Sequence, residues 1–417
     1  MKQIVIIGGG AAGLMAAYAA SSGNSRTPHA VTLIEKNERP ARKVMITGKG
    51  RCNVTNNCDV DTLIANTPGG GRFLYSAFNR MTPDDVMAFF EGLGVPLKTE
   101  RGNRVFPVSD KAVDIVDALV GSVRKNKVKI INETARDILQ QDGYVTGVRL
   151  SDGQIIPADR VILATGGLSY PTTGSTGDGY GMAQSLGHSV TELQPSLVPL
   201  VCHEGFCEWL SGLSLKNVTL SVYEDGKKKP VYTELGEMLF THFGISGPLV
   251  LSAAAHMRKM GEKQYYAVID LKPALNHEQL DRRILRDFGE NTNKNLANAL
   301  DKLLPKSIIP VVIGLSGIDP KTCVNQISRE QRAALVGVIK GVCLHIKSFR
   351  PVEEAIITRG GIKTKEIDPS TMQSKIIKGL YFAGEIIDVD AYTGGFNLQI
   401  AFSTGFLAGQ SAAEDEK

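Results

Sequence analysis

The stretch QIVIIGGGAAGLMAAYAA, residues 3–20, contains a short apolar run, a glycine turn and an alanine-rich segment. Residues 3–7 are predicted to form a fully buried parallel strand and residues 11–21 a helix. AVTLIE, residues 30–35, is predicted to form a second strand. Together these segments make a complete βαβ unit, so the sequence predicts a dinucleotide-binding fold at its start.

A GxGxxG pattern formed by Gly8, Gly10 and Gly13 lies between the first strand and the helix. Gly8 permits the tight turn, Gly10 leaves room for a pyrophosphate, and Gly13 lets the helix pack closely on the sheet. The helix N-terminus offers N–H groups and the positive end of its dipole to the phosphates. Glu35, at the end of the second strand, is expected to accept hydrogen bonds from the adenosine ribose. The predicted dinucleotide contacts also include Ala11, Ala12 and Lys36.

The remainder of the 417 residues suggests two or three domains. From about residue 191, short alternating segments predict an antiparallel β domain, and the segments after it have helical periodicity. Strand-like segments and a closing helix then return to the first domain. We predict an α/β protein whose Rossmann-like domain is interrupted by an insertion of about 160 residues that contains an antiparallel β domain and a small helical part. The expected boundaries are 1–190 and 355–417 for the nucleotide-binding domain, 191–275 and 343–354 for the β domain of the insertion, and 276–342 for the helices.

Composition and charge narrow the class of protein. A net charge of +4 is mild for this length, and 42% hydrophobic with 22% charged residues is typical of a globular protein. The six cysteines include no CxxC pair and no histidine at metal-binding spacing, so neither a metal site nor a disulfide framework is expected. The chain shows no export signal and no span long enough for a membrane, and we expect it in the cytoplasm.

Two segments favour FAD over NAD as the dinucleotide. DRVILATGGLSYP (159–171) resembles the short strand ending in Ala-Thr-Gly of two-dinucleotide-binding flavoproteins, which passes close to FAD. GLYFAGEIIDVD (379–390) resembles their C-terminal strand ending in Gly-Asp, whose acidic residue binds the ribityl chain. Glu385 replaces that aspartate here, which leaves Glu385 and Asp388 as alternatives. The contacts predicted with these segments also include Ala135, Thr165, Gly166 and Gly384.

The segment TGGFNLQIAFSTGFLAG, residues 393–409, is expected to begin a helix beside the isoalloxazine ring. A helix N-terminus aimed at the pyrimidine end of a flavin stabilises the negative charge that appears there on reduction. The expected donors are Gly394, Gly395, Asn397 and Leu398. The alternative is a C-terminal packing helix with an ordinary glycine start.

ARKVMITGKGRCNVTN (41–56), RGNRVFPVSDKA (101–112), GGLSYPTTGSTGDGYGMA (166–183) and GEMLFTHFGISGP (236–248) complete a larger pattern. In this order they resemble the bacterial HI0933-like flavoproteins, also called NAD(P)/FAD-dependent oxidoreductases, over essentially the whole chain. The resemblance implies a non-covalent FAD, an inserted β-barrel and a helical subdomain. It implies no second Rossmann domain, so NAD(P)H would visit the flavin transiently. Cofactor contacts are also expected from Arg42, Lys43, Arg51 and Asn53.

Members of that family are associated with reducing a uridine of 23S ribosomal RNA to dihydrouridine, with oxidation of amines such as aminoacetone, and with bile acid metabolism. Uracil reduction needs a hydride at C6 and a proton at C5. Cys52 is the candidate proton donor, and its replacement by alanine is expected to keep the flavin and lose turnover. His242 is a second candidate that would face the flavin. The alternatives are a packed, unreactive thiol and a structural histidine.

Basic residues are dense around the Cys52 loop and recur as Lys227, Lys228 and Lys229 in the insertion. Such charges could follow an RNA backbone, although the three lysines could equally be a solvated hairpin tip. The leading hypothesis is therefore an rRNA dihydrouridine synthase. The alternatives are an oxidase or reductase of a small molecule, either an aminoacetone-like amine or a steroid-like enone, and a non-catalytic flavin-binding protein.

Overall fold

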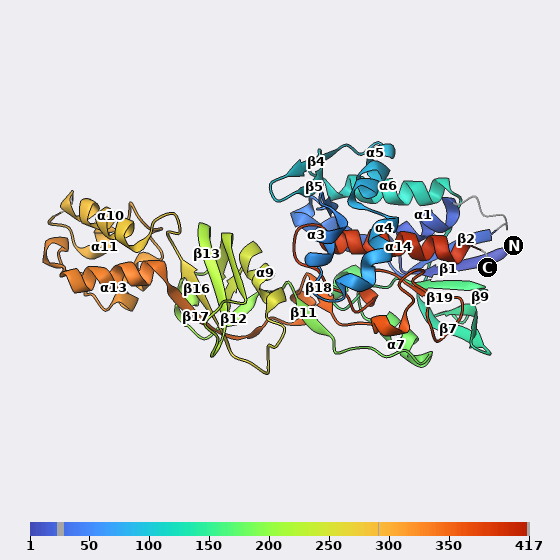
Figure 1. Ribbon diagram of the computed structural model, residues 1–417. Helices are drawn as coiled ribbons and strands as arrows, with labels where there is room; N and C mark the ends of the chain where they lie inside the picture. Colours follow the sequence, from blue (N-terminus) through green and yellow to red (C-terminus); the bar gives the residue numbers. More distant parts are fainter. Residues whose placement is uncertain (23–28, 291, 415–417) are drawn as a thin grey trace. The chain divides into compact units, whose positions relative to one another are not determined.

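A computed structural model describes residues 1–22, 29–290 and 292–414 of the chain (Figure 1). The chain forms two compact units. Unit 1 comprises Met1–Ser196 and Val352–Lys417, and unit 2 comprises Leu197–Pro351. Unit 2 is thus inserted into unit 1, and it contains both the barrel strands and the helices expected at 276–342. The further division of this insertion into two domains remains a prediction.

A five-stranded parallel sheet forms the centre of unit 1. Its central strands are largely apolar and buried, as strands covered on both faces of a parallel sheet require. The strand order places the first strand in the middle, between the strand that follows the glycine turn and the strand that ends in Ala-Thr-Gly. In spatial order the strands are β19 (Leu380–Phe382), β10 (Arg160–Leu163), β1 (Lys2–Ile7), β2 (His29–Glu35) and β6 (Lys129–Asn132).

Two helices pack closely against each other on this sheet, α1 (Ala11–Ser22) and α14 (Phe396–Ala413) (Figure 1). A Cβ atom on Gly405 would lie 2.3 Å from the Ala12 carbonyl oxygen, and one on Gly409 would lie 2.3 Å from that of Ala16. Both contacts are too short for any side chain. The small residues therefore let the first and last helices meet backbone to backbone.

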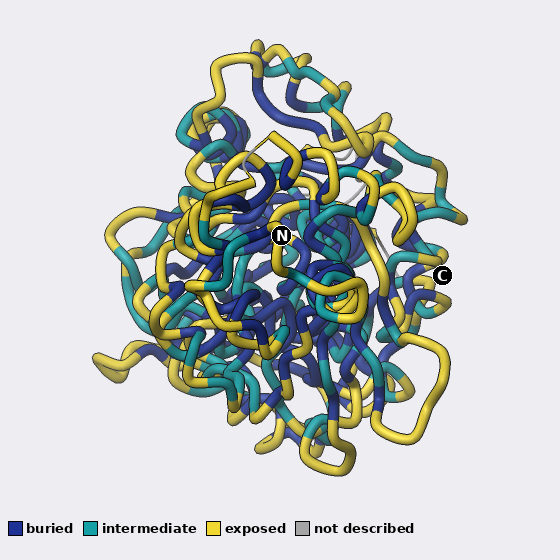
Figure 2. Tube along the Cα trace, turned by 90° about the vertical axis from the view of Figure 1, so that its left-hand side faces the viewer, coloured by how far each residue is buried: buried dark blue, intermediate teal, exposed yellow. Residues whose placement is uncertain are grey.

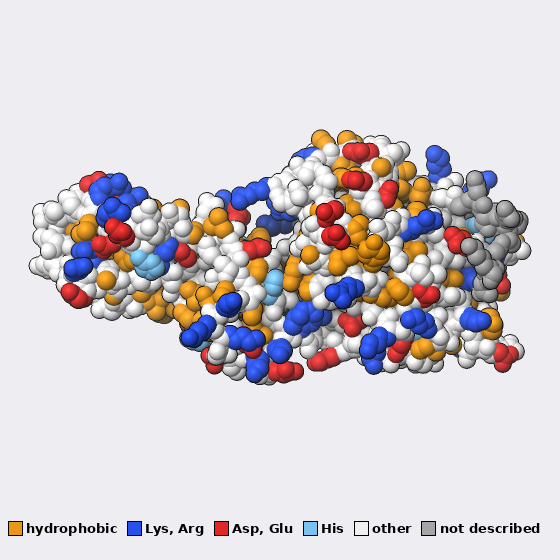
Figure 3. All heavy atoms as spheres, viewed as in Figure 1, with side chains coloured by type: hydrophobic (Ala, Val, Ile, Leu, Met, Phe, Trp, Pro, Cys, Tyr) orange, Lys and Arg blue, Asp and Glu red, His pale blue; other side chains and the backbone are white. Residues whose placement is uncertain are grey.

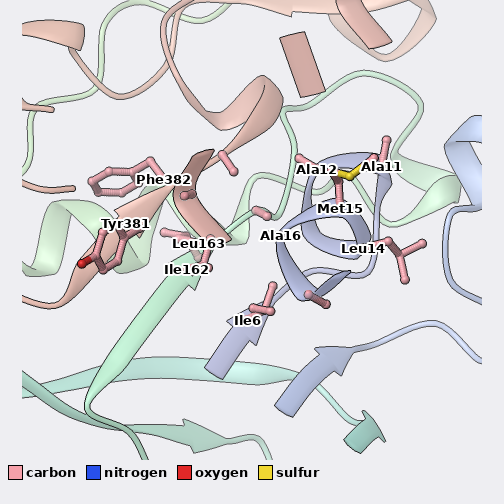
Figure 4. Packing of buried hydrophobic residues seen from close by; sticks show 14 of the residues in the cluster. Ile6, Ala11, Ala12, Leu14, Met15, Ala16, Ile162, Leu163, Tyr381 and Phe382 are labelled. Atoms are coloured by element: carbon pink, nitrogen blue, oxygen red, sulfur yellow. The ribbon is translucent and has the colours of Figure 1, made fainter. Parts of the chain in front are cut away.

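The core of unit 1 lies between α1 and the sheet (Figure 4). Side chains of α1, β1, β10 and β19 meet there, each of them buried. Burial of a large apolar side chain contributes about 1.5–3 kcal/mol. The exposed residues gather in turns and loops, drawn in yellow in Figure 2. The side chains labelled in Figure 4 are Ile6, Ala11, Ala12, Leu14, Met15, Ala16, Ile162, Leu163, Tyr381 and Phe382.

Smaller elements surround the parallel sheet of unit 1. The antiparallel strands are β3 (Thr55–Asn56), β4 (Leu97–Glu100) and β5 (Arg104–Pro107) in one sheet; β7 (Ala135–Gln141), β8 (Tyr144–Leu150) and β9 (Ile155–Pro157) in another; and the pair β11 (Gln194–Ser196) and β18 (Ile357–Arg359). The further helices are α2 (Arg42–Ile46), α3 (Val60–Ala65), α4 (Tyr75–Arg80), α5 (Pro83–Gly92), α6 (Ala112–Lys125) and α7 (Asp178–Ser185).

Unit 2 contains a closed six-stranded barrel whose strands are interrupted by helices, four of the described helices lying between β16 and β17. Its strands, in spatial order, are β12 (Leu200–Cys202), β15 (Gly244–Ser246), β14 (Tyr232–Thr241), β13 (Ser214–Glu224), β16 (Tyr265–Asp270) and β17 (Val342–Phe349). The helices are α8 (Phe206–Trp209), α9 (Pro248–His256), α10 (His277–Gly289), α11 (Leu296–Ala299), α12 (Ile309–Ser316) and α13 (Arg329–Lys340). The predicted fold class, a Rossmann-like domain interrupted by a barrel, is confirmed.

One helix is shorter than its periodicity predicts. The pattern over 296–304 favours a continuous helix, but α11 ends at Ala299 and turns follow it. Pro305 disfavours a helical conformation for Leu304, so the helical pattern ends by that residue, but α11 ends five residues earlier. Pro310, by contrast, stands in the first turn of α12, where its missing N–H costs nothing.

Candidate functional site

The glycine turn after β1 is tightly constrained. Gly8 has a φ of +102°, and a Cβ atom there would lie 2.5 Å from the Ala164 carbonyl oxygen of the neighbouring strand segment. A Cβ atom on Gly13 would lie 1.8 Å from the Gly8 carbonyl oxygen, so the start of α1 packs directly on the turn. A Cβ atom on Gly10 would meet no atom within 4 Å. The turn is therefore closed on its sheet side and open at Gly10.

Glu35 closes the second strand and is 7% exposed. Its Oε2 atom accepts a hydrogen bond from the Gly9 N–H at 2.6 Å, and its Oε1 atom accepts from the Asn37 N–H at 2.7 Å. A carboxylate can accept about four hydrogen bonds. The Asn37 amide supplies a third at 2.7 Å. Glu35 is thus held in place by the chain and keeps some capacity to accept from ribose hydroxyls.

A large cavity opens beside the glycine turn, entirely within unit 1. It contains about 1330 Å³ of empty space, including its open mouth. Among the predicted contact residues, those that line it are Gly8, Gly10, Ala11, Ala12, Glu35, Lys36, Arg42, Lys43, Ala135, Thr165, Gly166, Gly384, Glu385, Asn397 and Leu398.

The other predicted contact residues do not line this cavity: Gly13, Arg51, Asn53, Asp388, Gly394 and Gly395. Arg51 instead forms ion pairs of 2.5 Å with Glu100 and with Asp110, and its guanidinium lies 4.1 Å from the centre of the Phe106 ring. The hydrogen bonds to the two carboxylates raise the pKa of Arg51. The Arg51 guanidinium therefore binds carboxylates of the protein itself, and the structure supports no role for it in the cavity.

Gly394 and Gly395 shape the start of α14. A Cβ atom on Gly395, which has a φ of +98°, would lie 2.3 Å from the Thr55 carbonyl oxygen. The Asn56 side chain donates to the Gly394 carbonyl oxygen at 3.0 Å. Both glycines thus allow the start of α14 to pack closely against β3. The first turn of α14, with its free backbone N–H groups, therefore lies at the cavity wall, where Asn397 and Leu398 line the cavity.

The Asn397 side chain organises the loop before α14. Its Oδ1 atom accepts from the Ala391 N–H at 3.0 Å, and its amide donates to the Ala391 carbonyl oxygen at 2.9 Å. Any contact from Asn397 to a cofactor would therefore come from its backbone N–H. Because α14 has 18 residues, its aligned peptides place a positive partial charge at this end. The arrangement favours an anion or a developing negative charge in the cavity.

Glu385 lies at the centre of a polar cluster on the cavity wall. Its Oε2 atom is 2.6 Å from the Lys43 Nζ atom, and its Oε1 atom accepts from the Thr358 N–H at 2.8 Å. The Ser169 hydroxyl lies 3.0 Å from Oε1 and accepts from Lys43 at 2.6 Å. Of the two acidic candidates, Glu385 lines the cavity and Asp388 does not. Ser169 and Thr358 were missed from the sequence, where nothing marks a serine and a threonine as partners of a distant glutamate.

Two further features fit a bound dinucleotide. The Thr165 hydroxyl lines the cavity and is buried without a hydrogen-bond partner among the described residues. Buried polar atoms are rarely left unpaired, so Thr165 is suited to a ligand. Together with the open space at Gly10, the Glu35 carboxylate and the two helix N-termini, these residues fit phosphates, a ribose and the electron-rich end of a flavin.

Neither candidate proton donor lies in the cavity wall. Cys52 is 0% exposed and packs in the core of unit 1. Burial raises the pKa of its thiol to about 12. This placement fits the alternative of a packed, unreactive thiol. His242 belongs to the turn between β14 and β15 in unit 2, where its exposed ring contacts Phe243 edge to face.

The fold, the glycine turn and the cavity define a class of protein, the flavin-dependent oxidoreductases with a Rossmann-type FAD-binding domain. The chain belongs to the family described as the HI0933-like protein Rossmann domain, whose pattern matches residues 2–411. The family predicted from the sequence is thereby confirmed.

Three curated relatives align with nearly the whole chain. A 3-dehydro-bile acid delta(4,6)-reductase from Clostridium scindens is 32% identical, over 99% of this chain and 100% of its own. A ribosomal RNA dihydrouridine synthase from Escherichia coli is 29% identical, over 97% and 96%. The protein of the same name from Haemophilus influenzae is 32% identical, over 98% of each chain. The family thus includes reductases of chemically different substrates.

Solved structures support the fold. The 3-ketosteroid delta1-dehydrogenase from Sterolibacterium denitrificans superimposes with a TM-score of 0.52 over 99% of this chain and 100% of its own, at 13% identity. At that identity the likeness concerns the fold alone. Within the described ranges, no helix is sufficiently long and apolar to cross a membrane.

Proposed function

We propose that this protein reduces the C5–C6 double bond of a uridine in 23S ribosomal RNA to dihydrouridine, with NAD(P)H as the electron donor, in the cytoplasm. The observation that carries the proposal is the full-length similarity to two relatives named ribosomal RNA dihydrouridine synthase, from different organisms. Each aligns with at least 97% of this chain, so the similarity covers both units and not a shared nucleotide-binding domain alone.

The balanced reaction converts uridine, NAD(P)H and one proton to dihydrouridine and NAD(P)+. A bound flavin supplies the capacity to take a hydride from the nicotinamide and pass it to C6 of the base. The chain supplies the binding surfaces around it: the N-terminus of α1 for phosphates, Glu35 for the ribose, and the N-terminus of α14 for negative charge. Among the described residues the five-stranded sheet is the one parallel sheet, so NAD(P)H would share the open cavity and leave after transfer.

A second candidate is reduction of a steroid-like enone, favoured by the relative named 3-dehydro-bile acid delta(4,6)-reductase. Uracil and such an enone share a carbon–carbon double bond conjugated to a carbonyl group. In both, a hydride adds to the carbon remote from the carbonyl and a proton to the nearer one. The same flavin site could therefore serve either substrate, and the residues that bind the substrate must decide between them. Oxidation of a small amine requires none of these features and is the weaker alternative.

Deletion of the gene provides the test. Ribosomal RNA from the deletion strain would be digested with nuclease and its dihydrouridine measured by mass spectrometry. We expect one dihydrouridine of the 23S RNA to disappear and to return with the intact gene, but not with Gly10→Val, which fills the phosphate space. Unchanged dihydrouridine would reject the RNA substrate. Purified protein given NAD(P)H and a 3-oxo-Δ4 bile acid would then test the second candidate by loss of enone absorbance.

A further inference from the structure

A row of aromatic side chains lies on the outer face of the barrel in unit 2. Tyr223 on β13 stands opposite Tyr266 on β16, and Tyr266 stands opposite His345 on β17. We call these three residues the aromatic row. Their neighbours on each strand alternate with them: Val222, Tyr265 and Leu344 are buried in the barrel, so the row points outward.

The rings of the aromatic row form a partly preformed stack. The Tyr223 and Tyr266 rings are stacked, with their centres 5.1 Å apart and their planes 8° from parallel. The His345 ring continues the row, 6.4 Å from that of Tyr266 and tilted by 42°. The Glu204 carboxylate holds the His345 ring through its Nδ1 atom at 2.7 Å. His345 has 66% of its side chain exposed, so the row ends in accessible ring surface.

Positive charge gathers at the end of β13 and in the segment before β16, the two strands that carry Tyr223 and Tyr266. Lys227, Lys259 and Lys263, which we call the lysine cluster, all act on one carboxylate, that of Glu224, which follows Tyr223 in β13 and is itself buried. The hydrogen bond from Lys227, 2.7 Å long, is the main cause of the lowered pKa of Glu224, and the charges of the other two lysines add to it. Glu224 therefore offsets only part of this positive charge, and Asp225 and Glu262 belong to the same two turns. Figure 3 shows lysine and arginine side chains in the region where Figure 1 labels β12 and β17.

We propose that the aromatic row is a stacking platform for unpaired bases of an RNA strand, and that the lysine cluster binds the phosphates of that strand. The proposal rests on the RNA substrate proposed above and assigns part of its recognition to unit 2. Stacking on aromatic side chains combined with basic residues along the backbone is the usual way in which proteins bind single-stranded nucleic acid. A bile acid carries one carboxylate and no planar base, so it needs neither a row of stacked rings nor more than one cation.

The test measures binding, not catalysis. Full-length, flavin-loaded protein would be titrated into a fluorescein-labelled 12-nucleotide oligouridine and followed by fluorescence anisotropy. Replacing Tyr266 or Tyr223 by leucine keeps apolar bulk and removes the ring. We expect each replacement to weaken binding about tenfold. Tyr266→Phe keeps the ring and is expected to bind like the parent.

Matched controls separate stacking from charge and from misfolding. Tyr144 is exposed on β8 of unit 1, and Tyr144→Leu is expected to leave binding unchanged. The double variant Lys259→Ala, Lys263→Ala should lower the slope of log affinity against log salt by about 1.4, because each phosphate contact to a single strand contributes about 0.7. The affinity for a duplex of the same length should not change when Tyr266 is replaced by leucine. Flavin absorbance and circular dichroism report whether each variant is folded.

Two results would overturn the platform: no binding of the oligouridine by the parent protein, or equal binding by the parent and both leucine variants. The outcome is independent of the proposed reaction. If binding depends on the tyrosines while the deletion strain keeps all its dihydrouridine, the platform stands and the proposed reaction is wrong. If dihydrouridine is lost in the deletion strain but restored fully by the Tyr223→Leu, Tyr266→Leu double variant, with RNA binding unchanged, the reaction stands and the platform is wrong.

Discussion

The Nζ atom of Lys43 lies 2.6 Å from the Oε2 atom of Glu385, although the two residues are 342 positions apart in the chain. Both side chains are largely buried at the cavity wall, with 23% and 14% of their surfaces exposed. The ion pair therefore joins helix α2 to the turn after β19. It ties together two segments that are each expected to contact the flavin.

We expect Lys43→Met to lower the free energy of unfolding of the flavin-free protein by about 1–3 kcal/mol. The replacement leaves the mostly buried Glu385 carboxylate without its cation, and this range lies between the values for exposed and for fully buried ion pairs. Urea unfolding measures the change. The matched control is Arg149→Met, which breaks an ion pair with Asp137 whose partners are nearly half exposed. That change should cost less than about 1 kcal/mol. Equal effects of the two replacements would show that the buried pair has no special role.

Gly10→Val is expected to yield a folded protein that has lost its flavin. The added side chain enters open space at the glycine turn, where no atom lies within 4 Å of a Cβ. It would occupy the room for a pyrophosphate and weaken FAD binding roughly tenfold or more, a loss of at least about 1.4 kcal/mol. Absorbance near the flavin band and far-ultraviolet circular dichroism separate binding from folding. Gly13→Val, whose Cβ would collide with the Gly8 carbonyl oxygen, should instead yield no folded protein.

Cys52 gives opposite expectations from sequence and structure. As a proton donor it would be essential, but its thiol is fully buried, does not line the cavity, and has a pKa raised to about 12 by burial. On the structural evidence we expect Cys52→Ala to keep flavin and turnover and to cost about 1 kcal/mol of stability. Steady-state kinetics and thermal unfolding provide the measurement. A hundredfold loss of turnover with the flavin retained would reinstate Cys52 as the proton donor.

His188 is expected to make stability depend on pH. Burial lowers the pKa of its ring, against the opposing effect of the Glu366 carboxylate 3.2 Å away. The unfolded chain therefore binds a proton at His188 more readily than the folded chain. As the pH falls below about 6.5, this group lowers the free energy of unfolding by at most about 1.4 kcal/mol per pH unit, until the folded pKa is reached.

Replacement by glutamine tests this dependence, because His188→Gln cannot titrate. Its free energy of unfolding should fall less steeply than that of the parent protein just below pH 6.5. Glu366 also has a lowered pKa, and its contribution is present above its unfolded value and lost as the pH falls through its folded value. That loss lies in a more acidic range. Identical pH profiles for the parent and the variant would contradict the role assigned to His188.

The fold could be predicted because its decisive signals are local. These signals are an apolar strand, three glycines at fixed spacing and an acidic residue at the end of the next strand, all of which lie close together in the chain. The structure places Gly8 and Gly13 in contacts that only glycine allows. The alternation of short segments predicted an antiparallel β domain, and the resemblance to the family implied that it closes into a barrel. The length of α11 was predicted wrongly: the periodicity continues to Leu304, but the helix ends at Ala299 and turns follow it.

The site was harder to predict because its polar partners come from distant segments. The basic residues of the loop 41–56 were visible in the sequence, but not the carboxylates of Glu100 and Asp110 that engage Arg51. Likewise, a cysteine among basic residues suggests reactivity, whereas burial decides its pKa and depends on the packed structure. Which charges face a cavity and which face each other is a tertiary property.

The backbone contact between α1 and α14 has a consequence for how the protein is made. Residues 11–22 leave the ribosome long before Gly405 and Gly409 exist to cover them, so one face of the first helix waits uncovered through most of translation. The N-terminus of α14, which completes the cavity wall, arrives in the same late step. A nascent chain that stops short of residue 396 lacks the part of the cavity wall that Asn397, Leu398, Ile400 and Ala401 form, so the complete flavin cavity exists only once this helix has been made.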